Sequence, residues 1–221
     1  MSTQDELRSR FSAITTWKRG ETRAPHKPLL LLLALGRCSR NEERLVPYSV
    51  VDTELSNLLH EFGPPRNSYH PEYPFGRLRN DGLWELIGAE DLETRGSNTD
   101  PKKSEFLKKN VKGGFPEADY ELLSRDAELL ADIAALLLDN FFPETLHEDI
   151  CAAVGLEFKN PGTGNRRNPE FRKLVLRAYE YSCAVYDFDL RHDNKPVGLE
   201  AAHIKWLSEG GPNEIANGLC L

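Results

Sequence analysis

The centre of the fold is predicted by one stretch, Pro25-His-Lys-Pro-Leu-Leu-Leu-Leu-Leu-Ala-Leu-Gly36. Its second proline, Pro28, suits the first turn of a helix, where a missing N–H group removes no helical hydrogen bond. The leucine run that follows is apolar on every side of a helix, and such helices are buried. Gly36 is a residue that commonly ends a helix. We therefore predict that this stretch forms a buried helix at the centre of the main core.

Further helices are predicted on both sides of this core. A capping-box pattern at residues 3–6 precedes apolar residues at helical intervals from Leu7 to Ile14. Asp52 is of the type that caps a second helix, which Gly63 and two following prolines would end. Helical segments are also expected at residues 106–111, 120–123 and 129–138, with a short one after Thr145.

One β-hairpin is predicted in the same half of the chain. Asn80-Asp81-Gly82 is the strongest hairpin signal in the sequence, and apolar residues lie on both sides of it. The two strands are expected at residues 75–79 and 83–87. Tyr73 and Pro74 would then lead into the first strand.

The chain is expected to contain two domains. Asn160-Pro-Gly-Thr-Gly-Asn165 is small, polar and rich in turn residues, and the sign of the charge changes across it. We place a first domain at residues 1–158, a linker at 159–167 and a second domain at 168–221. The predicted fold class is α+β, with a helix-rich first domain that includes the hairpin.

The charge distribution restricts any nucleic-acid site to a local patch. The net charge is −7 at pH 7, which excludes a uniformly basic coat of the kind that binds nucleic acid non-specifically. Positive residues gather in four segments instead, and an interface would have to use one or more of them. These segments are residues 23–44, 66–79, 102–112 and 166–177.

Cysteine usage and hydropathy predict a cytoplasmic protein. The four cysteines are widely scattered, which is not the spacing of a disulfide framework, so we expect a reducing compartment and no disulfide. The apolar run Leu29 to Leu35 is far shorter than the ~20 residues that span a bilayer. The first ten residues are polar and contain no signal-peptide core. No membrane partner is therefore expected.

The last fifty residues carry several short motifs in a characteristic order. After a helical stripe that begins at Phe171 come Cys183-Ala-Val, Gly198-Leu-Glu-Ala-Ala-His203-Ile, Gly210-Gly-Pro and Asn217-Gly-Leu-Cys220. This order resembles the HNH endonucleases of the McrA-like, modification-dependent restriction group. The resemblance implies that His203 is the general base for the attacking water and that Asn217 braces the loop between two strands. It also implies a divalent ion, Mg²⁺ or Mn²⁺, in the complete form of the site.

The same segment departs from the HNH pattern in three places. Ala202 stands where an acidic or histidine metal ligand often precedes the base, and strand alternation places Glu200 on the opposite face from His203. Of the four ligands that a structural zinc site needs, only Cys183 and Cys220 remain, so they are either half of a former zinc site or ordinary buried thiols. The sequence also stops before the last metal-binding helix. We therefore expect an incomplete ββα-metal domain, in a chain that binds DNA without cutting it.

The start of the leucine helix is a candidate anion site. His26 and Lys27 lie at its N-terminal end, where exposed backbone N–H groups and the helix dipole favour a phosphate. The loop from Gly63 to Arg77 interleaves aromatic rings and prolines with arginines. Such a loop can present an apolar pocket next to positive charge.

These segments together are similar to the sulfur-binding domain of restriction enzymes that recognise phosphorothioated DNA. The resemblance rests on Pro25-His-Lys-Pro-Leu29, Phe62-Gly-Pro64, Tyr73-Pro-Phe75 and Arg79-Asn-Asp-Gly-Leu-Trp-Glu85. It implies that Tyr73 and Pro74 form an apolar wall for the sulfur and that His26 and Lys27 hold the modified phosphate. Further candidates for contacts with the DNA backbone or bases are Arg77, Arg79, Arg95 and Ser97.

The preferred interpretation is a type IV restriction protein that binds double-stranded, preferentially phosphorothioated DNA and, in its complete form, hydrolyses phosphodiester bonds. One alternative is a catalytically inactive reader of phosphorothioated DNA. A second alternative is a protein-interaction or regulatory module that uses the acidic helices between Glu117 and Asp149. Indifference to DNA sulfur would favour the second alternative.

Overall fold

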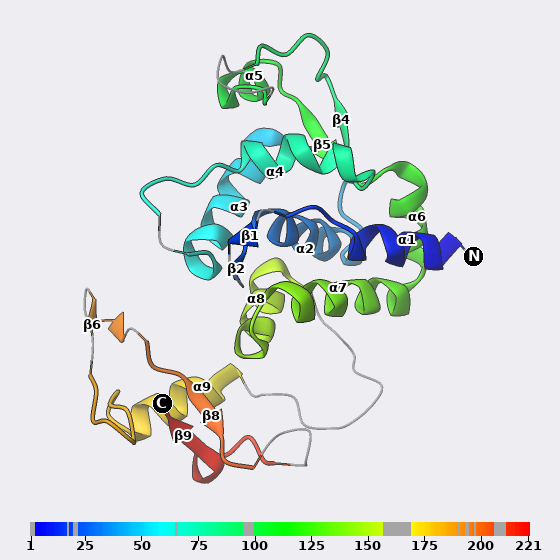
Figure 1. The fold of residues 1–221 in the computed structure, drawn as a ribbon. Helices are drawn as coiled ribbons and strands as arrows, with labels where there is room; N and C mark the ends of the chain where they lie inside the picture. The colour runs from blue at the N-terminus through cyan, green and yellow to red at the C-terminus, as the bar shows by residue number, and fades with distance from the viewer. Residues whose placement is uncertain are drawn as a thin grey trace. The chain divides into compact units, whose positions relative to one another are not determined.

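A computed structural model describes residues 3–16, 18–19, 22–64, 66–94, 100–156, 169–189, 191–192, 195–196, 198–205 and 211–221. The chain divides into two compact units, Met1–Phe158 and Lys159–Leu221. The first unit is built mainly of helices with one small sheet, and the second packs one helix against short strands (Figure 1). The helix-rich α+β class predicted for the first unit is confirmed.

Helix α2 (His26–Ser39) is the central element of the first unit. Its leucines from Leu29 to Leu33 are all at most 7% exposed, as expected for a helix that is apolar on every side. Other helices of the first unit pack against α2 or its neighbours (Figure 1). Among them are α1 (Thr3–Ser12), α3 (Tyr48–Phe62), α6 (Glu117–Arg125), α7 (Ala127–Phe141) and α8 (His147–Val154).

Gly36 does not end the central helix, which continues to Ser39. Its role is a close approach between helices, because a Cβ atom at this position would lie 2.0 Å from the backbone oxygen of Val154 at the end of α8. The Arg40 guanidinium secures the same junction, since Nη1 donates to the backbone oxygens of Val154 and Gly155 at 2.8 and 2.9 Å. Packing, and not helix termination, explains the glycine.

Helix α3 begins four residues earlier than the expected cap at Asp52. Its first residue is Tyr48, and Pro47 precedes it. Asp52 lies in the second turn, where it accepts a hydrogen bond from the Tyr48 hydroxyl at 3.1 Å and pairs with the Lys103 ammonium at 2.7 Å. The predicted end of the helix is confirmed, because Gly63 is its C-terminal cap.

The predicted hairpin at Asn80-Asp81-Gly82 is wrong. Helix α4 (Glu72–Arg77) and a 3₁₀ turn (Leu78–Asp81) occupy the place of its first strand. Phe75 and Leu78 are both fully buried, and their spacing of three residues matches one face of a helix. Gly82 has a φ of 68°, so the turn signal marks the end of this helical segment and not a two-residue hairpin loop.

The strand after that turn pairs elsewhere. β4 (Glu85–Ile87) is antiparallel to β5 (Lys112–Gly114), which also pairs with β3 (Val46–Pro47). The connection between β4 and β5 contains α5 (Lys103–Lys108). Two further short strands in this unit, β1 (Lys18–Arg19) and β2 (Thr22–Arg23), pair with each other just before α2.

A cluster of aromatic rings fixes α4 to the rest of the first unit. The Phe75 ring centroid lies 4.9 Å from that of Tyr48, 5.3 Å from Phe106 and 6.0 Å from Trp84. These distances are in the range of edge-to-face aromatic pairs. Because the partners come from α3, α5 and the start of β4, the exposed face of α4 is held in a defined position.

The second unit packs α9 (Pro169–Ala178) on a two-stranded sheet of β8 (Ala201–His203) and β9 (Gly218–Cys220). The strands are antiparallel, with His203 opposite Gly218. The helix predicted to begin at Phe171 is present as α9, in which Phe171, Val175 and Leu176 are buried. The unit also contains β6 (Arg191–His192), which pairs with β7 (Lys195–Pro196), and the 3₁₀ turn Ile215–Asn217, which leads into β9.

None of the described helices has both the length and the apolar character of a membrane span.

Candidate nucleic-acid interface

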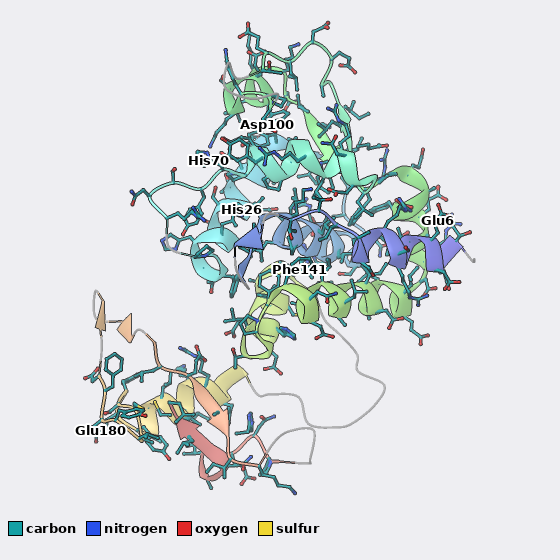
Figure 2. The ribbon with its side chains drawn as sticks, in the orientation of Figure 1. Glu6, His26, His70, Asp100, Phe141 and Glu180 are labelled. Atoms are coloured by element: carbon teal, nitrogen blue, oxygen red, sulfur yellow. The ribbon has the colours of Figure 1, made fainter. Side chains whose placement is uncertain are left out.

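Two segments that are distant in sequence meet at the start of α2. His26 is the first residue of this helix, and burial lowers its pKa, as do the nearby positive charges of Arg66 and His70. Figure 2 shows His26 and His70 in the same region of the first unit. The loop that precedes α4 therefore returns to the N-terminal end of the central helix and gathers positive charge there.

The electrostatics of the N-terminal end of α2 favour an anion. Pro25 is the capping residue and supplies no side-chain hydrogen bond, and the first turn holds no acidic residue. The first intrahelical bond runs from the Leu29 N–H to the Pro25 oxygen at 2.9 Å. The N–H groups of His26 and Lys27 thus belong to the set that an α-helix leaves without helical partners. Such groups and the helix dipole favour a negative ligand.

Lys27, predicted to hold the modified phosphate, is paired with a carboxylate in this structure. Its Nζ lies 2.6 Å from Oδ2 of Asp81, and the two side chains are 14% and 7% exposed. Oδ1 of Asp81 also accepts a hydrogen bond from the backbone N–H of Thr15 at 3.0 Å. The ion pair ties the start of α2 to the turn that follows α4, so Lys27 has an evident positioning role next to His26.

The predicted apolar wall lies on α4 and consists mainly of Tyr73 at its surface. Tyr73 is half-buried, whereas Pro74 is buried. The Tyr73 ring lies 5.2 Å, between centroids, from the His70 ring. The Tyr73 ring therefore lies next to His70, one of the two basic residues that act on His26.

His70 is held in place by two hydrogen bonds. Its Nδ1 lies 3.0 Å from Oε1 of Glu72, a carboxylate that is only 2% exposed, and its Nε2 lies 3.2 Å from the Ser68 hydroxyl. His70 and Arg66 were not among the predicted site residues. The aromatic and basic composition of the loop was a signal for them, but only the fold shows that this loop reaches His26.

The remaining predicted DNA contacts have different surroundings. Arg77 forms a two-point ion pair with Asp100, and Arg79 is exposed on the 3₁₀ turn after α4. Arg95 and Ser97 lie outside the described residues. Among the described residues, Thr94 and Pro101 form an antiparallel β-bridge.

The predicted general base of the second unit lies at the end of β8. The His203 ring stacks on Phe171, with 3.9 Å between centroids and 10° between planes. Its Nε2 lies 2.9 Å from Oδ1 of Asn213. If Nε2 donates to this amide oxygen, the lone pair is on Nδ1, the nitrogen that can take a proton from water.

Asn217 connects the two ends of the loop between β8 and β9. Its Oδ1 accepts from the Lys205 N–H at 2.8 Å, and its Nδ2 donates to the backbone oxygens of Lys205 and Pro212, both at 3.0 Å. The side chain is 8% exposed, so these bonds compensate its burial. This is the geometry of a loop brace.

The described part of the second unit does not fit a metal ion. Cys183 and Cys220 are buried in its core, and burial raises the pKa of the Cys220 thiol, with a smaller contribution from Cys183. Within the described ranges there is no group of three His, Cys, Asp or Glu side chains that could hold a metal. Glu200 pairs with Arg172 at 3.3 Å. Neither a tetrahedral zinc site nor a carboxylate site for Mg²⁺ or Mn²⁺ is therefore formed by these residues.

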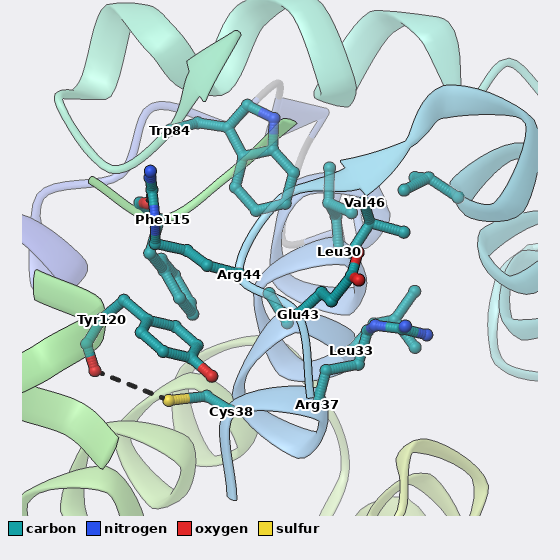
Figure 3. A pocket seen from close by; sticks show the side chains of 12 residues that line it. Leu30, Leu33, Arg37, Cys38, Glu43, Arg44, Val46, Trp84, Phe115 and Tyr120 are labelled. Atoms are coloured by element: carbon teal, nitrogen blue, oxygen red, sulfur yellow. Dashed lines mark hydrogen bonds between the residues drawn. The ribbon is translucent and has the colours of Figure 1, made fainter. Parts of the chain in front are cut away.

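A small pocket lies elsewhere in the first unit, against the middle of α2 (Figure 3). Its lining includes Cys38, Arg44, Trp84 and Tyr120, and Figure 3 marks the contact of the Cys38 thiol with the Tyr120 backbone oxygen. The cavity volume is about 10 Å³, which is room for about one water molecule. None of the predicted DNA-binding residues lines it, so the candidate interface is a surface and not this pocket.

Comparison with known proteins relates the first unit to DNA-binding domains. A family model described as the ScoMcrA-like DNA sulfur-binding domain matches residues 4–159. Among solved structures, the sulfur-binding domain of ScoMcrA complexed with phosphorothioated DNA is similar, with 27% identity and a TM-score of 0.61 over 68% of this chain and 95% of that chain. No curated protein matches the chain.

Two further structures share the fold at lower identity. The sulfur-binding domain of SprMcrA complexed with phosphorothioated DNA is 22% identical, with a TM-score of 0.60 over 70% of this chain and 95% of that chain. The type IV phosphorothioation-dependent restriction endonuclease ScoMcrA is 22% identical, with a TM-score of 0.58 over 88% of this chain and 47% of that chain. At such identities the likeness concerns the fold alone.

Proposed function

Because this chain belongs to the family of ScoMcrA-like DNA sulfur-binding domains, we propose that it binds double-stranded DNA and prefers phosphorothioated DNA. The observation that carries the proposal is the meeting of His26, Arg66 and His70 beside the half-buried Tyr73 ring. Positive charge and an apolar surface are the two features that a phosphate with one sulfur atom requires. In a chain with a net charge of −7, such a patch is local, and it orients the DNA toward one face.

The phosphate is bound at the start of α2. His26, the helical N–H groups and the surrounding charge of Arg66 and His70 supply donors and positive potential. Lys27 adds positive charge beside them, although its pairing with Asp81 makes it a positioning residue first. These contacts carry affinity for any phosphodiester, modified or not.

Sulfur preference comes from the Tyr73 ring. A non-bridging sulfur is larger and more weakly hydrated than oxygen, so it can rest on an aromatic surface without losing strong hydrogen bonds. An oxygen in the same place gives up hydration and gains no partner, which costs ~1–3 kcal/mol by protein mutational data. The difference between these two costs is the source of discrimination.

The direct test compares two duplexes that differ in a single phosphorothioate. Binding of the full chain to each duplex is measured by fluorescence anisotropy over a range of salt concentrations. We expect tighter binding of the modified duplex, with both affinities falling as salt rises. Equal affinity for the two duplexes contradicts the proposal and favours the protein-interaction alternative.

The pH dependence of binding tests the role of His26. Because the pKa of free His26 is lowered, a phosphate contact that favours the imidazolium must raise it on binding, and binding then takes up a proton. Affinity should therefore rise as pH falls from the bound-state to the free-state pKa, and level off below it. In His26→Gln this rise should disappear, as measured by anisotropy between pH 5 and 8.

A control for this measurement is His147→Gln, because His147 binds the Phe142 backbone oxygen in another part of the unit. That variant should keep the wild-type pH dependence of binding. His70→Gln tests whether the second imidazole of the site contributes to this dependence. If the pH dependence of binding is unchanged in His26→Gln, the phosphate does not bind at His26.

The lowered pKa of His26 has the opposite effect on the stability of the fold. Because the folded-state pKa lies below the unfolded value of about 6.5, the free energy of unfolding falls as pH drops below that value.

For the second unit we infer an HNH-type hydrolytic origin, with His203 as general base and Asn217 as loop brace. The observation that favours it is the bonding of Asn217 to both ends of the loop that follows His203. The described residues form no metal site. Cleavage would therefore need metal ligands from outside the described residues. Restriction, as distinct from DNA recognition, rests on this inference.

The expected result is binding without cleavage by the 221-residue chain. Supercoiled phosphorothioated plasmid incubated with the protein and Mg²⁺ or Mn²⁺ should remain intact on a gel. The reason is that the described residues form no site for the metal ion that phosphodiester hydrolysis by an HNH site requires. Nicking that depends on metal and is abolished by His203→Ala would show that this expectation is wrong. Nicking that persists in His203→Ala would instead indicate a contaminating nuclease.

A further inference from the structure

Arg77 lies against the ring of Tyr73. The two residues are four positions apart in α4 and so share one face of the helix. The Arg77 Cζ atom lies 4.8 Å from the centroid of the Tyr73 ring, within the ~6 Å that defines a cation–π contact. The Tyr73 ring thus has two close neighbours with basic side chains, His70 and Arg77.

Asp100 fixes the orientation of the guanidinium. The Arg77 Nε and Nη2 atoms donate to Oδ1 and Oδ2 of Asp100 at 2.8 and 2.5 Å. The carboxylate is largely buried, with 12% of its side chain exposed against 49% for Arg77. This hydrogen bonding and the negative charge of Asp100 raise the pKa of Arg77. A planar guanidinium that binds a carboxylate through two N–H groups is held in one orientation. A lysine ammonium could not make the same two-point contact.

The segment that carries Asp100 is itself packed on α4. A Cβ atom at Gly76 would lie 3.9 Å from Cδ of Pro101 and 3.5 Å from Cζ of Phe106, distances of ordinary van der Waals contact. The helix, the carboxylate and the guanidinium therefore lie together beside the Tyr73 ring.

We propose that Arg77, held by Asp100, is a positioning residue that sets the sulfur preference by orienting the Tyr73 ring, and that it does not contact a DNA phosphate. The inference rests on the proposed function, in which Tyr73 supplies the apolar wall. A guanidinium already bound to a carboxylate at two points offers a phosphate little net charge. A ring held in place before binding loses less conformational freedom when the DNA arrives.

The test measures the affinity of the full chain for the modified and the unmodified duplex at several salt concentrations. Arg77→Lys keeps the positive charge but loses the two-point contact with Asp100 and the planar guanidinium. Asp100→Asn removes the negative charge that orients the guanidinium. In both variants we expect the ratio of the two affinities to fall about twofold to fivefold, the equivalent of the ~0.5–1 kcal/mol of a cation–π contact at an exposed site, with an unchanged salt slope. The matched control is Arg125→Lys, because Arg125 pairs with Glu121 on an exposed face of α6. That variant should leave the ratio unchanged.

A double-mutant cycle separates positioning from a general effect on the fold. In a Tyr73→Ala background, Arg77→Lys should not change the ratio further, because the ring through which Arg77 acts is gone. A further fall in that background would overturn the inference. So would tighter binding of both duplexes by Asp100→Asn with a salt slope steeper by about one, since the released arginine would then bind a phosphate.

The same experiment distinguishes failure of this inference from failure of the proposed function. A wild-type chain with equal affinity for the two duplexes overturns both. A wild-type preference that persists unchanged in Arg77→Lys overturns only the positioning role of Arg77.

Discussion

Tyr73→Ala is expected to bring the affinities for phosphorothioated and unmodified DNA close to each other. The wild-type preference should be roughly 5-fold to 150-fold, the equivalent of the ~1–3 kcal/mol that burial of an unpaired polar oxygen costs. Without the ring, water reaches the modified phosphate, and an oxygen there is no longer penalised. The affinity for the unmodified duplex should change little, because the phosphate contacts at the start of α2 remain. Anisotropy titrations with the paired duplexes measure both quantities.

Two controls accompany this prediction. Tyr73→Phe retains the ring and should keep the preference, which assigns the effect to the aromatic surface and not to the hydroxyl. Tyr186→Ala removes a tyrosine that is 84% exposed in the second unit, and it should behave as wild type. A preference that survives Tyr73→Ala would mean that the wall lies elsewhere, with the segment of Arg95 and Ser97 as the next place to test.

Gly36→Ala is expected to cause a large loss of stability in the first unit. The added Cβ atom would lie 2.0 Å from the backbone oxygen of Val154, so α8 must move away and weaken the bonds of its last carbonyl groups with Arg40. Overpacking of this kind costs about 1–3 kcal/mol, occasionally more. It outweighs the gain of up to ~1 kcal/mol in helix propensity from replacing glycine by alanine. The free energy of unfolding is measured by urea denaturation followed by helical circular dichroism.

Gly76→Ala is the matched control, because it makes the same chemical change within a helix. Its nearest neighbours, at 3.5 and 3.9 Å from the new Cβ position, are at ordinary contact distances. We expect unchanged or slightly greater stability, owing to the better helix propensity of alanine. If the two variants lose stability equally, the close approach of α2 and α8 does not explain the need for glycine at position 36.

Local patterns were sufficient to predict most helices of the first unit, with α4 as the exception. The leucine run predicted α2, and the period of apolar residues predicted α1, α6 and α7. These elements depend on interactions within three or four residues and on burial of one face, which the order of residues already encodes. The same reasoning located Gly63 at the end of α3.

Local sequence signals gave wrong predictions where a residue interacts with a part of the chain that is distant in sequence. Asn80-Asp81-Gly82 has the chemistry of a hairpin turn, yet Asp81 binds Lys27 and the Thr15 N–H, and β4 pairs with β5. Gly36 has the chemistry of a helix cap, yet a neighbouring helix needs the space. A short motif cannot show which of its possible uses the rest of the chain requires.

The sequence by itself determined the helical character of the first unit, the central place of the leucine helix and the motifs that resemble a sulfur-binding and an HNH domain. Only the tertiary structure decided which side chains meet. It brought Arg66 and His70 to His26, paired Lys27 with Asp81, and placed Arg77 between Asp100 and the Tyr73 ring. The physical reason is that helix formation depends on near neighbours, whereas a binding surface joins loops whose positions depend on the packing of the whole unit.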